Sequence, residues 1–588
     1  MIPPRNLDTR HLFEAPATRK EWDERATELR ERILLATGLL PMPSKCPLQA
    51  RTTSTFEQDG IVVENVAIQT LPGFWLCGNV YRPAGSGPFP AIANPHGHWT
   101  HGRKEREADV READPAPAAP APGKADLVSL AVNLARQGFL VFAYDMVGYN
   151  ETDQVKHRHF GIDVESWAWG VSELGLQTWN SIRAVDYLCE RRDVDASRIG
   201  ATGASGGGTQ VFLLAAIDER IQASAPVNMV SAIMQGGCIC ENGPGLRVGT
   251  DNAEIAALFA PKPQLLVSCT GDWTRNLPKE EGPAVRRVYA LHDASSKLQW
   301  VQFNYQHNYN LPSREAVTAF FRRWLSMARP EAEKSSTISP ERLGVQRPAG
   351  IDEAGVHRWL RDEGAAATVR LRERGGAKGR ETLRTALRQA LAVEVPVTRR
   401  RSEPSRMVLV VSVSGDPRAG RIRDTIAARA GKSVRALELP AIAFDRNAAW
   451  KDFFSTYNRT AAGDRVAEVV AAASAAGTGI DIVGLGDAGA WCLLARAIAP
   501  KVLGGLAVCD MAELPIDDDR AVVDRLYAPG IRRAGDVATA AWLAAEGRVA
   551  LFRVGDRAAW DRVRLPASVR LETGAWSPEG IADFIADR

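Results

Sequence analysis

A serine flanked by glycines is the feature that most constrains what this chain can fold into. Ser205 lies in the segment ATGASGGGTQ (residues 201–210), between an apolar, strand-like run and the helix-like run TQVFLLAAI. Gly203 and Gly207 stand two residues before and after it, as a tight strand-to-helix turn requires, because a side chain at either place would collide with the neighbouring backbone. The pattern predicts a nucleophile at the edge of a sheet, although a chain with 50 glycines can also produce it by chance.

The surrounding segments alternate between strand and helix patterns. Short apolar runs such as FLVFAYD and PQLLVSCTGD are typical of strands buried in a parallel sheet, and LVSLAVNLARQG and TWNSIRAVDYLCER are typical of helices. This alternation predicts an α/β fold with a doubly wound, mostly parallel sheet. An amphipathic helix is expected over residues 21–37, followed by β-rich runs up to Pro83.

At 588 residues the chain is expected to form more than one domain. We predict a first domain over residues 1–330 and a second strand-helix series over residues 406–588. Residues 331–405 are expected to form a polar, breaker-rich linker followed by an arginine-rich helical segment. The low-complexity run DPAPAAPAPG (residues 114–123) is expected to be a mobile flap.

The charge balance argues against several classes of partner. The 73 basic and 70 acidic residues give a net charge of +3, which provides no electrostatic footprint for nucleic acid or an anionic membrane. No apolar run approaches the roughly 20 residues that span a bilayer, and the N-terminus lacks the features of a signal peptide. We therefore expect a cytoplasmic location, or secretion if a leader has been removed, and leave homo-oligomerisation open.

A serine nucleophile needs a histidine base that is oriented by a carboxylate. In an α/β-hydrolase the three follow in the order Ser, acid, His, each in the loop after its strand. Asp272 ends PQLLVSCTGD and His307 follows LQWVQF, which predicts the triad Ser205, Asp272 and His307. The weaker alternatives are His292 for the base, and Asp293 and Glu241 for the acid.

The oxyanion of the tetrahedral intermediate needs two donors that are already in place. One is expected to be the backbone N–H of Gly206, directly after the nucleophile. The other is expected to be the N–H of Gly97 or His98, in the loop NPHGHWTHG.

No metal site or cofactor is expected. His96, His98 and His101 lie close together, but no acidic or thiol ligand is found among them. Cys238 and Cys240 form a C-x-C pair without a second cysteine pair or a histidine nearby in the sequence, which is a weak zinc signature.

The first half of the chain resembles the α/β-hydrolase superfamily and, within it, bacterial acetyl xylan esterase-like carbohydrate esterases. The resemblance rests on GFWLCGNVYRP, NPHGHW, YDMVGYNETD, GASGGGTQ, TGDW and HNYN, and extends over residues 20–325. It implies deacylation of an esterified sugar or a related ester through an acyl-enzyme and without a cofactor. It also implies the roles of nucleophile for Ser205, acid for Asp272 and base for His307.

Aromatic residues near the predicted site are compatible with a sugar ester as the substrate. Indole faces pack on the apolar face of a pyranose and offer an N–H beside it. Tryptophans are also common core residues, so this remains an alternative to simple packing. The candidate substrate-binding residues are Trp99, Trp167, Trp169, Trp273 and Glu241.

The second half resembles the first but lacks its chemistry. GIDIVGLGDAGAWCLLARA aligns with RIGATGASGGGTQVFLLAA, so that Gly486 stands where Ser205 stands, and Gly555-Asp556 stands where Gly271-Asp272 stands. The last histidine of the chain is His357, so this half has no base for a triad. We predict a degenerate second α/β-hydrolase-like domain, and regard a dinucleotide-binding loop at VGLGDAG as the weaker interpretation.

These observations predict a serine carboxylic ester hydrolase that acts on a small-molecule or oligosaccharide ester. A peptidase of the prolyl-oligopeptidase type shares the triad order but normally carries a propeller domain, which this sequence does not indicate. A non-catalytic binding scaffold is the third alternative, and the complete Ser-Asp-His order in the first half argues against it.

Overall fold

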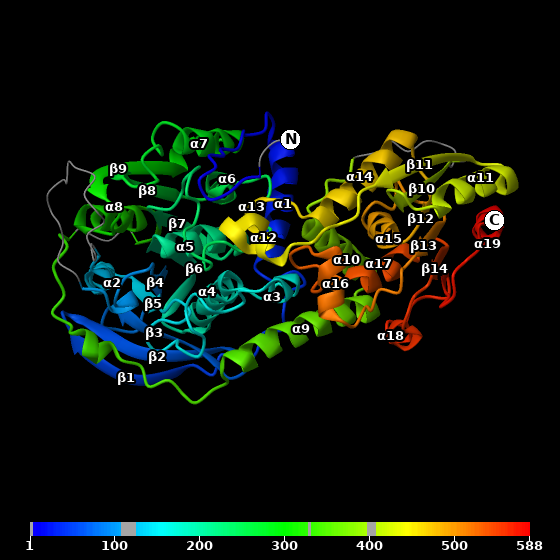
Figure 1. The fold of residues 1–588 in the computed structure, drawn as a ribbon. Helices are drawn as coiled ribbons and strands as arrows, with labels where there is room; N and C mark the ends of the chain where they lie inside the picture. The colour runs from blue at the N-terminus through cyan, green and yellow to red at the C-terminus, as the bar shows by residue number, and fades with distance from the viewer. Residues whose placement is uncertain (1–3, 107–124, 327–330, 397–406, 588) are drawn as a thin grey trace. The chain divides into compact units, whose positions relative to one another are not determined.

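The structure is a computed structural model that describes residues 4–106, 125–326, 331–396 and 407–587 (Figure 1). The predicted flap at 114–123 lies outside the described residues. The chain divides into two compact units. The first contains residues up to 37, 44–162 and 171–360, and the second contains residues 38–43, 163–170 and those from 361 onward.

The first unit is built on a nine-stranded sheet with the order β1-β2-β3-β5-β4-β6-β7-β8-β9. Strands β1, β2 and β3 pair antiparallel at one side, and β5, β4, β6, β7, β8 and β9 pair parallel. The strands are β1 (Arg51–Gln58), β2 (Ile61–Leu71), β3 (Phe74–Arg82), β4 (Phe89–Pro95), β5 (Leu140–Tyr144), β6 (Val194–Ala204), β7 (Ile221–Val227), β8 (Gln264–Gly271) and β9 (Leu298–Gln306).

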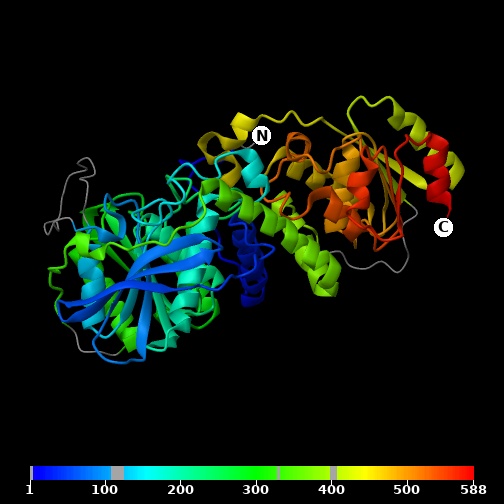
Figure 2. The ribbon, with the colours of Figure 1, turned by 90° about the horizontal axis from the view of Figure 1, so that it is seen from below.

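Helices cover both faces of this sheet, as a parallel sheet requires. On one face α2 (Leu127–Arg136) and α8 (Leu311–Phe321) enclose one hydrophobic core. On the other, α1 (Arg19–Ala36), α5 (Gly206–Ile217), α6 (Asn252–Ala257) and α7 (Glu281–Leu291) enclose a second, with α4 (Glu173–Glu190) packed beside α5. Figure 2 shows the sheet between these two helical layers.

The predicted amphipathic helix is α1. Its expected apolar positions, Trp22, Ala26, Leu29 and Ile33, all lie buried in the second of these cores. Thr18 and Glu21 cap its first turn with reciprocal hydrogen bonds, which explains where the helix begins.

The segment predicted as a linker packs on the first unit instead. Ile338 and Leu343 are fully buried in the core beneath α2, and Asp59 accepts hydrogen bonds from Ser336 and Thr337. The boundary between the units falls after Leu360, within α9 (Glu353–Arg374) and inside the range 331–405 that was predicted to lie between the domains. The polar composition that suggested a linker serves these hydrogen bonds.

The second unit contains a six-stranded, fully parallel sheet with the order β11-β10-β12-β13-β14-β15. Helices α11 and α19 cover one face, and α10, α14, α15 and α17 pack together. The strands are β10 (Met407–Val413), β11 (Ser433–Leu439), β12 (Asp481–Gly484), β13 (Ala507–Asp510), β14 (Val549–Phe552) and β15 (Val569–Leu571). The helices are α10 (Gly376–Leu391), α11 (Arg418–Ala430), α14 (Ala461–Ala476), α15 (Ala488–Ile498), α17 (Asp536–Ala544) and α19 (Pro578–Ala586).

Shorter helices complete the two units. Those of the first unit are η1 (Gly102–Lys104), η2 (Ser295–Lys297), η3 (Arg322–Ser326) and η4 (Pro340–Leu343). Those of the second are α3 (Val164–Ala168), α12 (Arg446–Trp450), η5 (Lys451–Phe453), α13 (Phe454–Tyr457), α16 (Asp519–Leu526) and α18 (Arg557–Asp561).

The predicted fold class is confirmed, with large and mostly parallel sheets flanked by helices. Among the described residues, none of the helices has the length and apolar character needed to cross a membrane.

Candidate active site

Ser205 occupies a strained turn between β6 and α5. Its backbone has φ 58° and ψ −127°, in a region that residues with side chains rarely adopt. A Cβ atom on Gly203 would lie 2.4 Å from the Pro95 carbonyl oxygen, and one on Gly207 would lie 2.6 Å from the same atom. Both glycines are therefore required by close approach, as the sequence pattern predicted, and the serine is held at the start of a helix.

Asp272 and His307 follow β8 and β9, and the structure brings them together. His307 Nδ1 lies 2.8 Å from Asp272 Oδ2. The other carboxylate oxygen accepts hydrogen bonds from the Thr274 backbone N–H at 2.7 Å and from its hydroxyl at 2.5 Å. Asp272 is thus oriented from both sides, and it holds the imidazole so that Nε2 is the nitrogen left for chemistry.

The serine and the histidine share one edge of the sheet. Strands β6, β7, β8 and β9 are neighbours and run parallel, so their carboxyl ends meet there. The Ser205 backbone N–H donates to the Val227 carbonyl at the end of β7. The next residue, Asn228, donates from its side chain to the carbonyl of Asn308, which adjoins His307. These bonds connect the Ser205 turn to the His307 loop through the end of β7, and His307 in turn contacts Asp272.

The alternative base His292 lies elsewhere. It forms the C-cap of α7, where Arg19 and Asp23 are its charged neighbours. The alternative acid Asp293 is exposed at the same helix end. The structure therefore pairs His307, and not His292, with a buried carboxylate.

The two predicted oxyanion donors come from loops that touch. Gly206 is the first residue of α5, where backbone N–H groups have no partner within the helix. A Cβ atom on Gly97 would lie 2.9 Å from Ser205 Cβ and 3.3 Å from the Gly206 nitrogen. The backbone of Gly97 therefore lies directly against the turn that carries Ser205, as a second donor group would need to.

His96 and His98 differ in role. The His96 ring is buried, with Nδ1 2.7 Å from the Gly97 carbonyl oxygen and Nε2 accepting from the Met146 N–H. Burial lowers the pKa of His96 to about 3, so the ring is neutral at physiological pH. The His96 ring therefore holds its own loop against the loop that follows β5. The His98 ring instead lies beside Gly206 and within 3.1 Å of Cys240 Sγ.

Two of the predicted tryptophans flank the histidine. The Trp273 ring centroid is 4.3 Å from that of His307, and the Trp99 ring stacks at 6.1 Å. Both indole Nε1 atoms and His307 Nε2 are buried without a hydrogen-bond partner among the described residues. Three polar atoms around one histidine are therefore free to meet a polar ligand.

Trp167 and Trp169 belong to the second unit of the chain. Residues 163–170 belong to the second unit, where Trp167 packs on Trp450 and the Trp169 indole donates to Asp519. Within that unit both side chains have packing or hydrogen-bond partners, and their role as a sugar platform stays a prediction.

Glu241, one of the predicted substrate-binding residues, lies next to the nucleophile turn. One oxygen accepts hydrogen bonds from the Gly237 and Cys238 N–H groups, and the other lies 3.4 Å from the Cβ position of Gly206. Burial raises the pKa of Glu241 above its ordinary range.

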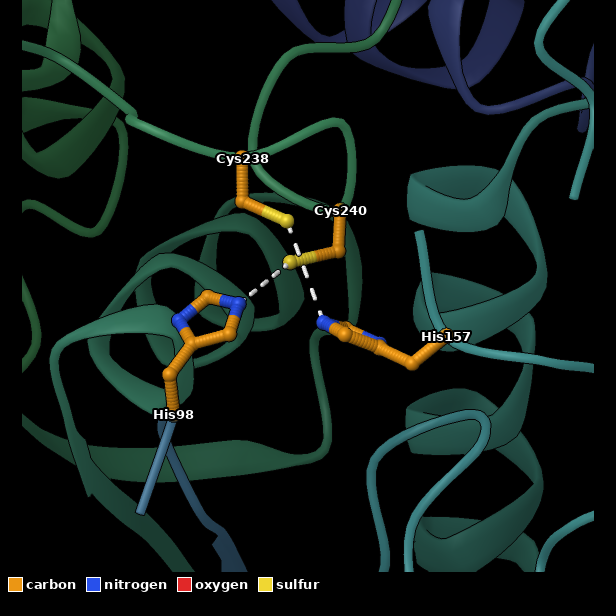
Figure 3. A group of neighbouring side chains, drawn as sticks. All are labelled: His98, His157, Cys238 and Cys240. Atoms are coloured by element: carbon orange, nitrogen blue, oxygen red, sulfur yellow. Dashed lines mark hydrogen bonds between the residues drawn. The ribbon is translucent and has the colours of Figure 1, made fainter. Parts of the chain in front are cut away.

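Sequence reasoning missed one group of residues at this edge of the sheet. His98, His157, Cys238 and Cys240 converge, with their ligand atoms all within 4.8 Å of one another (Figure 3). The C-x-C pair has no histidine near it in the sequence, but in the folded chain two histidines lie beside it. The signal was present in the two motifs, H-G-H and C-I-C, because both follow strands of a parallel sheet whose carboxyl ends meet.

The second sheet also carries a turn of the elbow type. Gly486 has φ 59°, close to the value at Ser205, and follows β12 as Ser205 follows β6. A Cβ atom on Gly484 would lie 2.7 Å from the Ala488 carbonyl oxygen, as one on Gly203 would lie 2.9 Å from that of Gly207. At the adjacent strand end, the buried Asp510 is paired with Arg418 and Arg553.

Comparison with known proteins places the first unit in a superfamily. No protein-family model matches the chain. A solved structure named Methylesterase BT1017 is 33% identical, covers 54% of this chain and 67% of its own, and has a TM-score of 0.45. The chain belongs, through this half, to the α/β-hydrolase superfamily.

Two further relatives match about half of the chain. The "Putative hydrolase YtaP" of Bacillus subtilis (strain 168) is 25% identical over 327 residues, which is 51% of this chain and 99% of the relative. An acetyl xylan esterase from Paenibacillus sp. R4 is 18% identical, covers 54% of this chain and 96% of its own, and has a TM-score of 0.33.

Proposed function

We propose that the first unit is a serine hydrolase that cleaves carboxylic esters through an acyl-enzyme. Ser205 is the nucleophile, His307 the general base and Asp272 the residue that orients the imidazole and stabilises its charged form. Membership of the α/β-hydrolase superfamily and the esterases among its relatives support ester hydrolysis as the reaction.

The observation that carries the proposal is the arrangement of His307. Its Nδ1 contacts the buried carboxylate of Asp272, which Thr274 holds from the other side. Its Nε2 has no hydrogen-bond partner among the described residues. The residue that shares its edge of the sheet is a serine on a strained turn at a helix N-terminus. A purely structural histidine would normally have both ring nitrogens satisfied in a buried setting.

The reaction then follows from the geometry. His307 Nε2 takes the Ser205 hydroxyl proton as the oxygen attacks the ester carbonyl. The negative charge that develops on the carbonyl oxygen is stabilised by the N–H of Gly206 and by the Gly97–His98 backbone. Protonated His307 gives its proton to the leaving alcohol, and then activates the water that hydrolyses the acyl-enzyme.

The substrate we propose is an ester of a carbohydrate. Trp99 and Trp273 place two aromatic faces and two unpaired N–H donors around His307, a combination that suits a polar ring with an apolar face. Relatives named as a methylesterase and an acetyl xylan esterase leave two choices, an acetyl ester on the sugar or a methyl ester of a sugar acid.

The test is hydrolysis of p-nitrophenyl acetate by the full chain beside Ser205→Ala. We expect kcat to fall by about 10³-fold or more, because the variant loses the hydroxyl that forms the proposed acyl-enzyme. Ser197→Ala is the matched control, since Ser197 is exposed on the same strand. Equal activity of Ser205→Ala and the unaltered protein would refute the proposal.

A panel of natural esters then separates the two choices of substrate. Acetylated oligosaccharides and methyl-esterified oligouronides are offered at equal concentration, and acetate and methanol are measured. Trp273→Phe, which removes the indole N–H and keeps an aromatic ring, is expected to raise KM for the sugar ester and to leave that for p-nitrophenyl acetate nearly unchanged.

A further inference from the structure

Four side chains beside the nucleophile turn have the chemistry of a metal site. His98 comes from the loop after β4, His157 from the loop after β5, and Cys238 and Cys240 from the loop after β7. Figure 3 shows the two imidazole rings and the two thiols pointing toward a common centre. His98 Nε2 lies 3.1 Å from Cys240 Sγ, and His157 Nε2 lies 3.8 Å from Cys238 Sγ.

These distances are those that a tetrahedral zinc site needs. With Zn–S bonds of about 2.3 Å and Zn–N bonds of about 2.0 Å, the ligand atoms of a regular tetrahedron stand about 3.3–3.8 Å apart. The four atoms here lie within 4.8 Å of one another. An ion could therefore be bound with side-chain shifts of less than about 1 Å, and two nitrogens with two sulfurs are a common ligand set of structural zinc.

The surroundings orient the ligands as metal ligands usually are. His157 Nδ1 lies 2.7 Å from Glu173 Oε1 and 2.9 Å from the Val147 carbonyl oxygen, so its proton is held there and its Nε2 lone pair faces the thiols. A carboxylate behind a ligating histidine fixes its tautomer and strengthens it as a donor. Both sulfurs are protected, since Cys238 is 5% exposed and Cys240 is fully buried.

We propose that His98, His157, Cys238 and Cys240 bind one zinc ion in a closed, structural site. Four protein ligands complete the tetrahedron and leave no position for substrate, which distinguishes a structural from a catalytic zinc. The ion links three loops that come from different strands, and so it stabilises the folded state of the first unit.

The site also borders the candidate oxyanion hole. The His98 ring lies 3.1 Å from the Cβ position of Gly206, and Glu241, next to Cys240, lies beside the same glycine. Zinc would therefore fix the position of the loop that carries Gly97 and His98 against Ser205. This consequence for catalysis rests on the proposed ester hydrolysis, whereas zinc binding itself does not.

The first experiment measures metal content. The full chain is produced in zinc-supplemented medium, dialysed, and analysed by inductively coupled plasma mass spectrometry. We expect close to one zinc per chain, and a loss of at least tenfold in Cys238→Ser and in His157→Ala. Cys189→Ser is the control and keeps its zinc, because Cys189 lies on α4 outside the cluster. Equal zinc content in Cys189→Ser and Cys238→Ser would overturn the assignment.

A second experiment does not depend on whether the variants fold. The unaltered chain is stripped with a chelator under reducing conditions and titrated with Co²⁺. A tetrahedral site with two thiolates gives intense visible d–d bands and a sulfur-to-cobalt charge-transfer band, which zinc abolishes by displacement. Absence of these bands after reduction overturns the proposal. A Cys238–Cys240 disulfide would lower the mass of the chain by two hydrogens. If such a chain takes up no Co²⁺ after reduction, the proposal is likewise overturned.

The third measurement separates this proposal from the esterase proposal. In the Ser205→Ala variant, removal of zinc is expected to lower the unfolding temperature by about 5 °C or more, and zinc restores it. No change in that temperature would contradict a structural role. The two proposals can fail separately. If the chain binds zinc but Ser205→Ala does not alter ester hydrolysis, the metal site stands and the proposed nucleophile is rejected.

Discussion

At the scale of single residues, the candidate site depends on a few side chains with restricted freedom. One carboxylate oxygen of Asp272 contacts His307 and the other accepts a hydrogen bond from Thr274, so the carboxylate cannot rotate without losing one of these bonds. The indoles of Trp99 and Trp273 both pack on the His307 imidazole, which limits the movement of that ring. The site is therefore arranged before substrate binds, which is the condition under which electrostatic stabilisation contributes most.

The role of Asp272 leads to a sharp prediction. Asp272→Asn keeps the size of the side chain, but its NH₂ group can face His307 Nδ1 and favour the wrong tautomer. We expect kcat for p-nitrophenyl acetate to fall by about 10³–10⁴-fold, with little change in KM. Asp293→Asn, at the exposed alternative acid, is expected to leave both constants unchanged. Similar losses in both variants would contradict the assignment of the acid.

How much of the site the sequence could reveal depended on how each residue is placed. Ser205, Asp272 and His307 each follow a strand-like run, so their order along the chain already predicted a common edge. His157 lies in a loop without a pattern of its own, and only the folded chain brings it to Cys238. Trp167 and Trp169 have Trp450 and Asp519 as partners within the second unit, which no local pattern could indicate.

At the scale of elements, strands with apolar runs were the predictable ones. Strands β5 and β8 carry such runs, whereas β1 (RTTSTFEQ), an edge strand with only one neighbour, is polar and largely exposed. Polar composition also explains why the segment that begins at residue 331 was predicted as a linker. Its buried side chains are few, and most of its attachment is through hydrogen bonds that composition does not reveal.

An ion cluster connects the antiparallel strands to the end of α4. Glu64 on β2 accepts hydrogen bonds from Arg82 on β3 and from Arg191, which follows α4. Burial raises the pKa of Glu64, but the hydrogen bonds and charges of Arg191 and Arg82 outweigh burial and bring it below its ordinary value of 4.5. A carboxyl group with a depressed pKa stabilises the fold above its unfolded pKa, and this contribution is lost as the pH falls through the folded value.

Glu64→Gln tests this cluster through the pH dependence of stability. We expect the variant to lose about 1.5–3 kcal/mol of unfolding free energy at pH 7, the typical value of hydrogen bonds to a charged group. The difference from the unaltered protein should shrink as the pH falls below 4.5, when Glu64 itself becomes protonated. Urea unfolding midpoints at a series of pH values measure it, with the exposed Glu57→Gln as control. A difference that does not vary with pH would argue against the ion cluster.

At the scale of the whole molecule, the two sheets share an order of strands. The order β11-β10-β12-β13-β14-β15 is that of β5-β4-β6-β7-β8-β9, strand for strand. Flavodoxin-type sheets begin with the same order, so topology alone does not distinguish a degenerate copy from a common α/β arrangement. The matching glycine turn at Gly486 favours the copy, which remains a prediction. The division of the chain was less predictable, since residues 38–43 and 163–170 join the second unit across long separations in sequence.

If the second unit is a degenerate hydrolase, restoring a serine should not restore catalysis. Gly486→Ser has room for its side chain, since the nearest atoms to the new Cβ are 3.6 and 3.9 Å away, on Arg418 and Asp416. However, the backbone N–H of Gly486 already donates to Asp510, and the sequence contains no histidine after His357. The hydroxyl would have no base, and its surroundings would be paired charges.

We therefore expect the double variant Ser205→Ala/Gly486→Ser to hydrolyse no ester and to react with no fluorophosphonate probe. The single variant Gly486→Ser should keep the activity of the unaltered chain and lose at most about 1–2 kcal/mol of stability, because a residue with a side chain would occupy a positive φ. Probe labelling that depends on Gly486→Ser would show that the second turn can still activate a nucleophile. In that case the unit would be a dormant active site, and its charged cluster around Asp510 would have to supply the base.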